Sequence, residues 1–515
     1  MATTQQLRSK TGCLTCRARK KKCDQQTPVC GLCNRLKYKC QWPTPEKLID
    51  RRFLSHQESR YATKSPAPDI NTEVDITKTE SMGPHSSQLH AFAFNISLLS
   101  ELVAYRHISS DLEIVISKHF AEKYCGLLLL PNSHPKFYDG WLTGMFRLIP
   151  YHDGLRYSVL ANGASHLHLV DKNDSMYELA LTYYSSALQH LVKSLDKEQE
   201  EAAENNGLLM SVMLLYLHGC QGRGTYTDIP THVSAATRIL STRLLSSQLS
   251  IERPFDRLAI ESVLYQIFSV STGLWFEDPP LVYHFDPQFW LRAEQLLDQT
   301  VLFPDGSNSL NSPVLGVPVS LYRLTLLLKQ QFREIRENSY NLSVLEGIRS
   351  EIQNWETLVL CDQDQDRLSS DEQTTQAYQF HRDGSYLFVL TLSLLLEQIE
   401  HSVRNLQASS RLDLPGMVSP VCWQITKARE IIQRRQHDDG WKMCFVGSWP
   451  VYTLGFFMSS IEDIELIRAE MMDRWRLTGF SQVSRYMNDL ESIWARRGFS
   501  LADGSLSLNR RTLPI

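Results

Sequence analysis

Apolar residues recur at helical spacing through most of the chain from about residue 90 onward. In the segment MYELALTYYSSALQHLVKSL, Leu181, Tyr184, Leu188, Leu191 and Leu195 follow one another at steps of three and four. The same spacing recurs in further segments, at residues 260–270, 321–335, 344–358, 385–400 and 487–497. Alternating, β-branched sequence is scarce. The pattern therefore predicts a large all-α body over residues 90–515, built from about twelve or more helices.

None of these apolar stripes runs beyond about two heptads, so they indicate a packed core rather than the seam of a coiled-coil dimer. The longest apolar runs, such as residues 386–396, are also well short of the roughly 20 residues that a membrane-spanning helix needs. The polar first residues, MATTQQLRSK, lack the apolar core of a secretory signal. We therefore expect a soluble, intracellular protein with no membrane partner.

The helical pattern is absent between residues 44 and 89. Residues 62–88, ATKSPAPDINTEVDITKTESMGPHSSQ, are polar and contain proline, which predicts a largely disordered linker over 44–89. Its acids alternate loosely with Ile70, Val74 and Ile76, so an activation segment is an alternative to a plain linker. No sustained heptad repeat follows residue 42, so no coiled coil can be recognised there. A homodimer is still a candidate assembly.

Charge and cysteine are concentrated before this linker. Residues 1–43 carry ten lysines and arginines against one acid, Asp24, whereas the rest of the chain has a net charge of −13. A basic head on an acidic body indicates a polyanionic partner for the head. The head also holds six of the eleven cysteines, and in a reducing compartment clustered cysteines indicate metal ligands rather than disulfides. The other five are expected to be buried free thiols: Cys125, Cys220, Cys361, Cys422 and Cys444.

The six clustered cysteines form an internal repeat, C-x2-C-x6-C-x6-C-x2-C-x6-C. A shift of 17 residues superimposes one half on the other: Cys13, Cys16 and Cys23 become Cys30, Cys33 and Cys40. Two tetrahedral zinc ions need eight ligand positions, so six sulfurs are enough only if two of them bridge. The repeat favours Cys13 and Cys30 as the bridges, because that choice preserves its pseudo-twofold relation. We therefore predict two Zn²⁺ as cofactors, with all six cysteines as ligands.

Metal binding should also be what folds this segment. About 28 residues cannot bury enough apolar surface to fold alone. Each C-x-x-C is expected to begin a short helix, RARKKK at 17–22 and NRLKYK at 34–39. The first is the more basic, and so the better candidate for the major groove of DNA, while other cations would contact phosphates. The predicted DNA contacts are Arg17, Arg19, Lys20, Lys21, Lys22, Arg35 and Lys37.

Residues 13–40, with all six cysteines, the basic run and the loop proline Pro28, strongly resemble the fungal binuclear zinc cluster family, the Zn₂Cys₆ transcription factors. The resemblance implies the same bridging cysteines, and it implies that Arg19 and Lys20 read a CGG-like triplet. Arg19 stands where lysine is common in the family, which leaves the base preference open. The helical body resembles the regulatory region of such factors, through the Trp-Pro segment at 447–457 and the later Trp494.

Together these features predict a sequence-specific transcription regulator in the nucleus. We expect a Zn₂Cys₆ DNA-binding domain over residues 1–43, the linker, and an α-helical regulatory domain over 90–515. The basic run RARKKK is also a candidate nuclear import signal. Double-stranded DNA is the expected partner, with the transcription machinery or coregulators. From family habit alone we expect an activator of RNA polymerase II transcription, and a pathway-specific regulator of a metabolic (secondary metabolite) gene cluster is a hypothesis.

The same residues also fit another functional class. A zinc-dependent protein-interaction module without a DNA role, or a repressor, is the alternative hypothesis. Enzymatic activity is not expected, because the segments that resemble catalytic or metal motifs are incomplete. HRDGSYLF at 381–388 lacks the asparagine of a kinase catalytic loop, and residues 362–373 lack the glycine and glutamate of a calcium loop. His166 and His168 are two residues apart, which places them on different faces of a helix.

Overall fold

The computed structural model of the chain describes residues 13–41, apart from 14, 17, 18, 20, 22, 25, 27 and 28. It also describes residues 110–499, apart from 132, 196–204, 222–223, 246–249, 276–284, 305–307, 338, 362–371 and 407–418. The predicted linker over 44–89, with its suggested activation segment, lies outside the described residues. The chain divides into two compact units, Met1–Met82 and Gly83–Ile515.

Helices build the second unit, and no strand occurs among the residues that the structure describes. The prediction of an all-α body is therefore confirmed. Its α-helices are α4 (Asp111–His119), α5 (Lys136–Leu148), α6 (Asp153–Asp171), α7 (Asp174–Leu195), α9 (Asn206–Gln221), α10 (Ile229–Leu245), α11 (Pro254–Thr272), α12 (Pro287–Gln299), α13 (Val319–Arg336), α14 (Leu342–Cys361), α15 (Glu372–Leu406), α16 (Trp423–Arg434), α17 (Asp439–Met443), α18 (Ser448–Gly455), α19 (Ile461–Thr478) and α20 (Ser481–Arg496). Short 3₁₀ turns are η5 (Cys125–Leu128), η6 (Ile149–Tyr151), η7 (Tyr226–Asp228), η8 (Asn308–Asn311) and η10 (Phe445–Gly447), and η4 (Phe120–Tyr124) is a π-helix.

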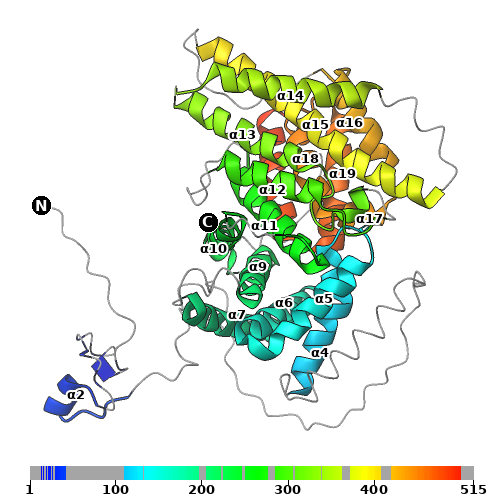
Figure 1. The fold of residues 1–515 in the computed structure, drawn as a ribbon. Helices are drawn as coiled ribbons and strands as arrows, with labels where there is room; N and C mark the ends of the chain where they lie inside the picture. Colours follow the sequence, from blue (N-terminus) through cyan, green and yellow to red (C-terminus); the bar gives the residue numbers. More distant parts are fainter. Residues whose placement is uncertain are drawn as a thin grey trace, which may run out of the picture. The chain divides into compact units, whose positions relative to one another are not determined.

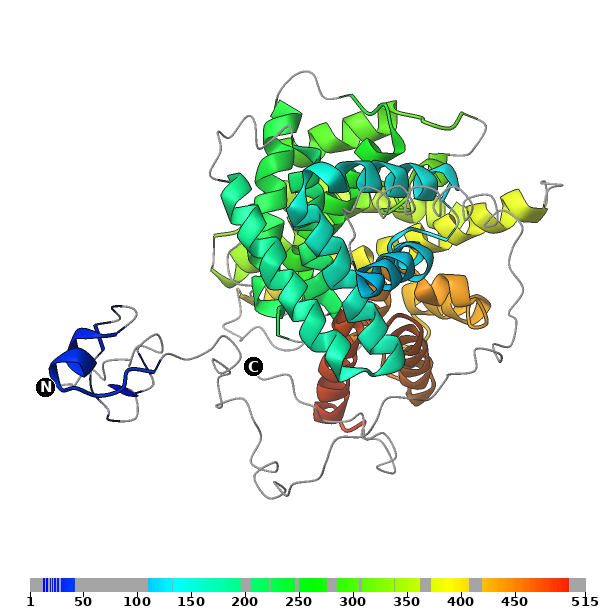
Figure 2. The same ribbon diagram turned by 90° about the horizontal axis from the view of Figure 1, so that it is seen from below.

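The helices from α4 to α15 follow one another in sequence order through the unit (Figure 1). The helices α4 to α7 lie at one end, α9 to α12 in the middle and α13 to α15 at the other end. The last helices turn back against earlier ones: α18 packs on α15, and α20 packs on α9. Figure 2 shows the same helices from below, with the C-terminal helices in red and brown. The hydroxyl of Ser481, at the start of α20, donates to the carbonyl of Cys220 in α9 at 2.5 Å.

Local sequence signals fix the ends of several helices. Ser110 and Ser460 cap α4 and α19, since each hydroxyl accepts a hydrogen bond from the backbone N–H three residues later, at 3.1 Å. Gly479 is the C-cap of α19. Its φ of 64° lies in the left-handed region, which glycine adopts without strain. These signals lie in loops between apolar segments. They therefore determine where a helix begins or ends, whereas the apolar periodicity determines that a helix forms.

The predicted leucine stripe of α7 is only partly the buried face. Tyr184 and Leu191 are buried, together with Ala180 and Ala187, whereas Leu181 and Leu188 are half-buried. Small alanines allow α6 to approach closely, and α6 is the main neighbour of α7. The helix was therefore predicted correctly, but the residues that face the core centre were not all identified.

The two tryptophan features noted in the sequence lie in contact. The Trp-Pro segment forms α18, in which all residues are buried. The indole Nε1 of Trp494, in α20, donates to the carbonyl of Gly455 in α18 at 2.9 Å. A Cβ on Gly455 would lie only 2.8 Å from a methyl carbon of Leu490. This glycine therefore permits the close approach of α18 and α20.

The segment that resembles a kinase loop joins two helices. Asp383 in α15 is fully buried and forms ion pairs with Arg434 in α16 and with Arg435, whose Nε lies 2.8 Å from Asp383 Oδ2. The neighbouring His381 is hydrogen-bonded through Nδ1 to the carbonyl of Gly316 at 2.9 Å. The aspartate is thus engaged by two guanidinium groups, which gives it a structural role.

The remaining cysteines differ in burial. Cys125 and Cys444 are buried, as expected, whereas Cys220 and Cys422 are half-buried. Cys361 is exposed at the end of α14, so the expectation of a buried thiol is wrong there. It falls on the outer side of the helix, next to the exposed Leu358 and Leu360. His166 and His168 have different partners, as their spacing predicts: His166 Nδ1 lies 2.8 Å from His119 Nε2, and His168 Nδ1 lies 2.9 Å from the Asn173 carbonyl.

Candidate metal centre and nucleic-acid interface

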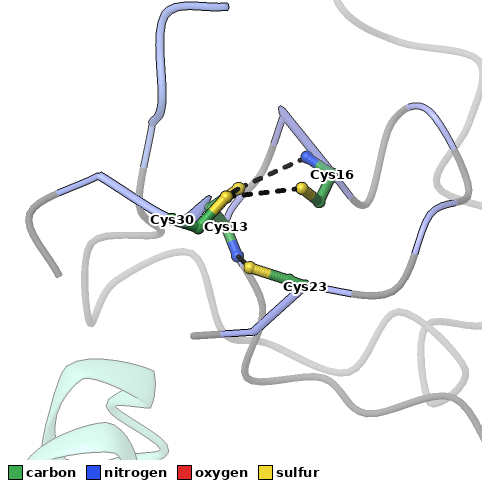
Figure 3. A group of neighbouring side chains, drawn as sticks. All are labelled: Cys13, Cys16, Cys23 and Cys30. Atoms are coloured by element: carbon green, nitrogen blue, oxygen red, sulfur yellow. Dashed lines mark hydrogen bonds between the residues drawn. The ribbon is translucent and has the colours of Figure 1, made fainter. Parts of the chain in front are cut away.

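The six clustered cysteines of the first unit converge in space. Their sulfurs form two groups of four, and in each group all sulfur atoms lie within 4.8 Å of one another. The groups are Cys13, Cys16, Cys23, Cys30 and Cys13, Cys30, Cys33, Cys40. Cys13 and Cys30 belong to both. In the first group, Cys16 and Cys23 direct their side chains toward the Cys13–Cys30 pair (Figure 3).

Distances between the buried sulfurs suit tetrahedral thiolate coordination. The Sγ atom of Cys13 lies 3.7 Å from that of Cys30 and 3.7 Å from that of Cys33. The Sγ atom of Cys16 lies 3.6 Å from that of Cys30. A zinc ion with four sulfurs at about 2.3 Å places neighbouring sulfurs about 3.8 Å apart. The all-sulfur donor set also suits structural zinc, so these residues fit a site for two zinc ions.

The 17-residue repeat of the sequence is also a repeat of hydrogen bonds. The backbone N–H of Cys16 donates to Sγ of Cys13, and that of Cys33 donates to Sγ of Cys30, both at 3.3 Å. The N–H groups of Cys13 and Cys30 donate to the sulfurs of Cys23 and Cys40, both at 3.4 Å. The two halves therefore hold their sulfurs by equivalent backbone contacts. Such contacts orient thiolates as metal ligands and disperse their charge.

The short helices begin earlier than predicted. In the second half, α2 spans Gly31–Arg35, and it ends before Lys37, which has a left-handed φ of 52°. In the first half, Thr15 and Cys16 are helical, whereas Arg19 lies in a turn and Lys21 in no regular element. In the second half the helix begins directly after Cys30 and contains Cys33, which brings these two sulfurs together. The chain must then bend to return the third cysteine of each half, so the described residues Arg19, Lys21 and Lys37 are not in the helices predicted over 17–22 and 34–39.

Hydrogen bonds make these buried thiols unequal. Burial raises the pKa of Cys33 to about 12 and that of Cys13 further. Burial opposes ionisation of Cys30 as well, but hydrogen bonds from the Cys33 backbone and from neighbouring thiols lower the pKa of Cys30 to about 6. Thiolates crowded in this way repel one another, and a bound dication supplies the charge that stabilises them.

The basic side chains that the structure describes in this unit are on its surface. Arg19, Lys21, Arg35 and Lys37 are all exposed. The guanidinium carbon of Arg19 lies 3.9 Å from the ring centroid of Tyr38, which comes from the other half of the repeat. This stacking restricts the Arg19 side chain while it leaves the edge of the guanidinium free to donate. The other three predicted DNA contacts, Arg17, Lys20 and Lys22, lie outside the described residues, as does Pro28.

Two residues that the sequence reading did not single out join the halves. The Thr15 hydroxyl donates to the Lys39 carbonyl at 2.7 Å and accepts from the N–H of Gln41 at 3.2 Å. Asp24, the one acid of the basic head, accepts from the N–H of Gly31 at 2.8 Å. A Cβ on Gly31 would lie 2.5 Å from the Asp24 carboxylate, so glycine fits this contact. The signal for Asp24 was present in the sequence, because a lone acid in a basic segment needs a local reason.

Comparisons with known proteins match both units. A sequence model of the fungal-specific transcription factor domain matches residues 115–506, and one of the fungal Zn(2)-Cys(6) binuclear cluster domain matches residues 11–48. The chain belongs to the fungal-specific transcription factor family. The match to the binuclear cluster domain agrees with the sulfur geometry, and together they indicate two bound zinc ions.

Individual relatives come from several fungi. The chain is 28% identical to the transcriptional activator protein UGA3 of Saccharomyces cerevisiae, over 42% of this chain and 41% of the relative. It is 25% identical to the aspercryptin biosynthesis cluster-specific transcription regulator of Emericella nidulans, over 52% of this chain and 40% of the relative. A zinc cluster transcription factor of Candida albicans is 55% identical over 38 residues, which are 7% of this chain and 10% of the relative.

The chain thus spans about two fifths of the length of the first two relatives. No solved structure matches the chain. Among the described helices, none is both long enough and apolar enough to span a membrane.

Proposed function

We propose that this protein is a sequence-specific DNA-binding regulator of transcription that acts in the nucleus. The observation that carries the proposal is the pair of four-sulfur groups that share Cys13 and Cys30, with exposed basic side chains around them. In the proposed site all six cysteines are zinc ligands and the two shared residues bridge the ions. The charge of the ions keeps the thiolates together and thereby supplies the folding free energy of the unit.

Arg19 is the proposed reader of bases, together with Lys20. Its stacking on Tyr38 supports this role, because a restricted guanidinium loses less conformational freedom when it donates to guanine O6 and N7. The triplet that it reads is proposed to be CGG-like. Arg17, Lys21, Lys22, Arg35 and Lys37 are proposed to contact phosphates, which fix the register of the unit on DNA.

The division of the chain follows from the same proposal. Residues 1–43 bind DNA, residues 44–89 link, and residues 90–515 regulate through coregulators or the transcription machinery. The names of two relatives, an activator and a regulator of one biosynthetic cluster, support a pathway-specific activator of a metabolic gene cluster. The basic run at 17–22 is proposed to serve in nuclear import as well, and no catalytic step is included.

The experiment is DNA binding by the full-length, zinc-loaded chain, measured by fluorescence anisotropy. A duplex with CGG half-sites is compared with one in which each triplet is replaced, across a range of salt concentrations. We expect tighter binding to the CGG duplex and an affinity that falls steeply with salt. The variant R19A with K20A should lose about 1–3 kcal/mol of discrimination between the two duplexes for each good bidentate contact removed.

The matched control is K39A, since Lys39 is an exposed cation of the same unit outside the proposed contact set. It should retain the discrimination. Equal discrimination by the double variant and the parent would refute the reading pair. Absence of salt-dependent binding to either duplex would instead favour a zinc-dependent protein-interaction module. One or two chains per duplex would decide between a monomer and a homodimer.

A further inference from the structure

A cavity lies among the helices of the second unit, remote in sequence from the six clustered cysteines. It is lined by residues of α9 and α11 from the middle of the unit and of α18 and α20 from its C-terminal part, together with Trp141 of α5. Of these helices, α9, α11 and α18 are labelled in the middle part of the unit in Figure 1. The empty space amounts to about 910 Å³, open solvent at its mouth included.

The chemistry of the wall restricts what could bind. Aliphatic and aromatic side chains dominate the wall, and none of its side chains is an aspartate, glutamate, lysine, arginine or histidine. An ion bound there would lose its hydration without gaining a charged partner, which is costly. An uncharged, mainly apolar molecule meets no such penalty. Its burial against aromatic rings is favourable in proportion to the apolar area removed from water.

The polar groups of the wall fall into two classes. Along one edge they satisfy each other: the Ser269 hydroxyl donates to Gln482 Oε1 at 3.1 Å, and Gln482 Nε2 donates to Tyr486 Oη at 2.6 Å. Elsewhere, Gln266 Oε1 and Trp449 Nε1 are buried without a hydrogen-bond partner. Both residues are 2% exposed and both line the cavity. Buried polar atoms without partners are rare, because each costs free energy until a partner is supplied.

We propose that this cavity binds an uncharged, mainly apolar small molecule that carries a hydrogen-bond donor and an acceptor. The donor is directed to Gln266 Oε1, and the acceptor receives the N–H of Trp449. The bound molecule contacts α9 and α11 on one side and α18 and α20 on the other, so it joins segments that are far apart in the chain. Binding would therefore stabilise the packing of the C-terminal helices against the rest of the unit. The proposal is independent of DNA binding by the first unit.

Neutral fluorescent probes test this inference on the full-length, zinc-loaded chain. N-phenyl-1-naphthylamine carries an N–H donor, 6-propionyl-2-dimethylaminonaphthalene carries a carbonyl acceptor, and 1-anilinonaphthalene-8-sulfonate is the anionic comparison. We expect saturable binding of one molecule of each neutral probe. The anionic probe should bind at least about tenfold more weakly, because the wall offers no cation.

A cavity-filling variant provides the decisive comparison. Ser262 lines the cavity from α11, and S262F places a ring in the space. It should weaken both neutral probes at least about tenfold while the thermal melt shows an intact helical fold. If neither neutral probe saturates, or if S262F binds both as tightly as the parent with its fold intact, the proposal is wrong.

The hydrogen-bond assignment has its own test. Q266L should weaken the donor probe about three- to tenfold and leave the acceptor probe unchanged, and W449F should do the reverse. The matched control is Q221L, since Gln221 is a buried glutamine with unpartnered side-chain atoms that does not line the cavity. Q221L should bind both probes like the parent. If Q266L and Q221L behave alike, Gln266 is not the acceptor.

Discussion

In the cysteine-rich unit the buried side chains of the described residues are four cysteines, Cys13, Cys16, Cys30 and Cys33. In the helical unit a continuous core of aliphatic and aromatic side chains extends from η4, which follows α4, to α20. The described part of the first unit buries almost no apolar side chain besides cysteine, so its fold depends on a few sulfur ligands and on the charge that they bind. The second distributes its stability over many contacts. A single side chain therefore counts for much more in the first unit than in most positions of the second.

The largest expected effect is the loss of a shared ligand. C30S removes one sulfur from both groups of four, so it should abolish sequence-specific DNA binding and leave the thermal transition of the helical unit unchanged. Fluorescence anisotropy and circular dichroism measure the two outcomes. C361S, at an exposed cysteine of α14, should change neither. A C30S protein that still prefers the CGG duplex would contradict the metal-dependent fold.

The opposite pattern, a loss of stability in the helical unit with the zinc content unchanged, is expected when a buried charge of that unit is removed. Arg474 is fully buried, with Nε 2.9 Å from Glu470 Oε1 and Nη1 2.7 Å from the Cys444 carbonyl. R474L leaves Glu470 without its charge partner, so the free energy of unfolding should fall by about 3–5 kcal/mol in urea titrations. The zinc content should stay at two per chain.

The control for this change lies on the same helix. Arg476 is mostly exposed and pairs with Asp473 at 3.2 Å, so R476L should alter the unfolding free energy by less than about 0.5 kcal/mol. Equal effects of R474L and R476L would show that the buried pair does not govern stability.

Acid should weaken the helical unit through buried histidines. Burial lowers the pKa of His218 and of His232 to about 4, although Asp228 beside His232 acts in the opposite direction. The unfolded chain binds these protons near the ordinary pKa of about 6.5. Stability is therefore complete above about pH 6.5 and falls as the pH drops toward 4, by about 1.4 kcal/mol per pH unit for each histidine.

Urea titrations at pH 7.5 and 5.5 measure this loss. Unfolding is followed by the circular dichroism of the helices, so that release of zinc in acid does not contribute to the result. H218Q removes one of the titrating groups and should reduce the stability lost between these two pH values by about 1.4 kcal/mol in total. An unchanged loss in H218Q would mean that His218 does not titrate with unfolding.

The smallest effect concerns the asymmetry of the cysteine-rich unit. Thr15 joins the halves through the Lys39 carbonyl and the Gln41 N–H, and its repeat equivalent is Leu32. T15V should lose about 0.5–1.5 kcal/mol of stability for this unit. Competition with a zinc chelator would then require a correspondingly lower chelator concentration. L32M, which keeps the apolar contact of Leu32 with the cysteine cluster at the equivalent position of the other half, should require the same concentration as the parent.

The sequence reading was most reliable where one physical constraint decides. Eight ligand positions and six sulfurs require sharing, and the structure brings Cys13 and Cys30 into both groups. Helical periodicity likewise predicted the helices of the second unit. The short helices of the first unit were misplaced because propensity has little weight in a segment whose backbone must return each third cysteine to the metal.

The contacts between distant segments were beyond the sequence pattern. Tyr38 under Arg19, Thr15 on the Lys39 carbonyl and the central cavity all depend on how the chain closes in three dimensions. Glutamine and tryptophan in an apolar stripe, such as Gln266 and Trp449, are ordinary core residues by pattern. Only their unpartnered polar atoms distinguish them, and such atoms can be recognised only in the three-dimensional structure.

The zinc K-edge X-ray absorption spectrum of the full-length chain tests the central claim most directly. The account predicts four sulfur neighbours per zinc at about 2.3 Å and a second zinc within roughly 3 Å, because shared thiolates hold two tetrahedra edge to edge. Nitrogen or oxygen ligands, or the absence of a zinc–zinc distance with both sites filled, would contradict it.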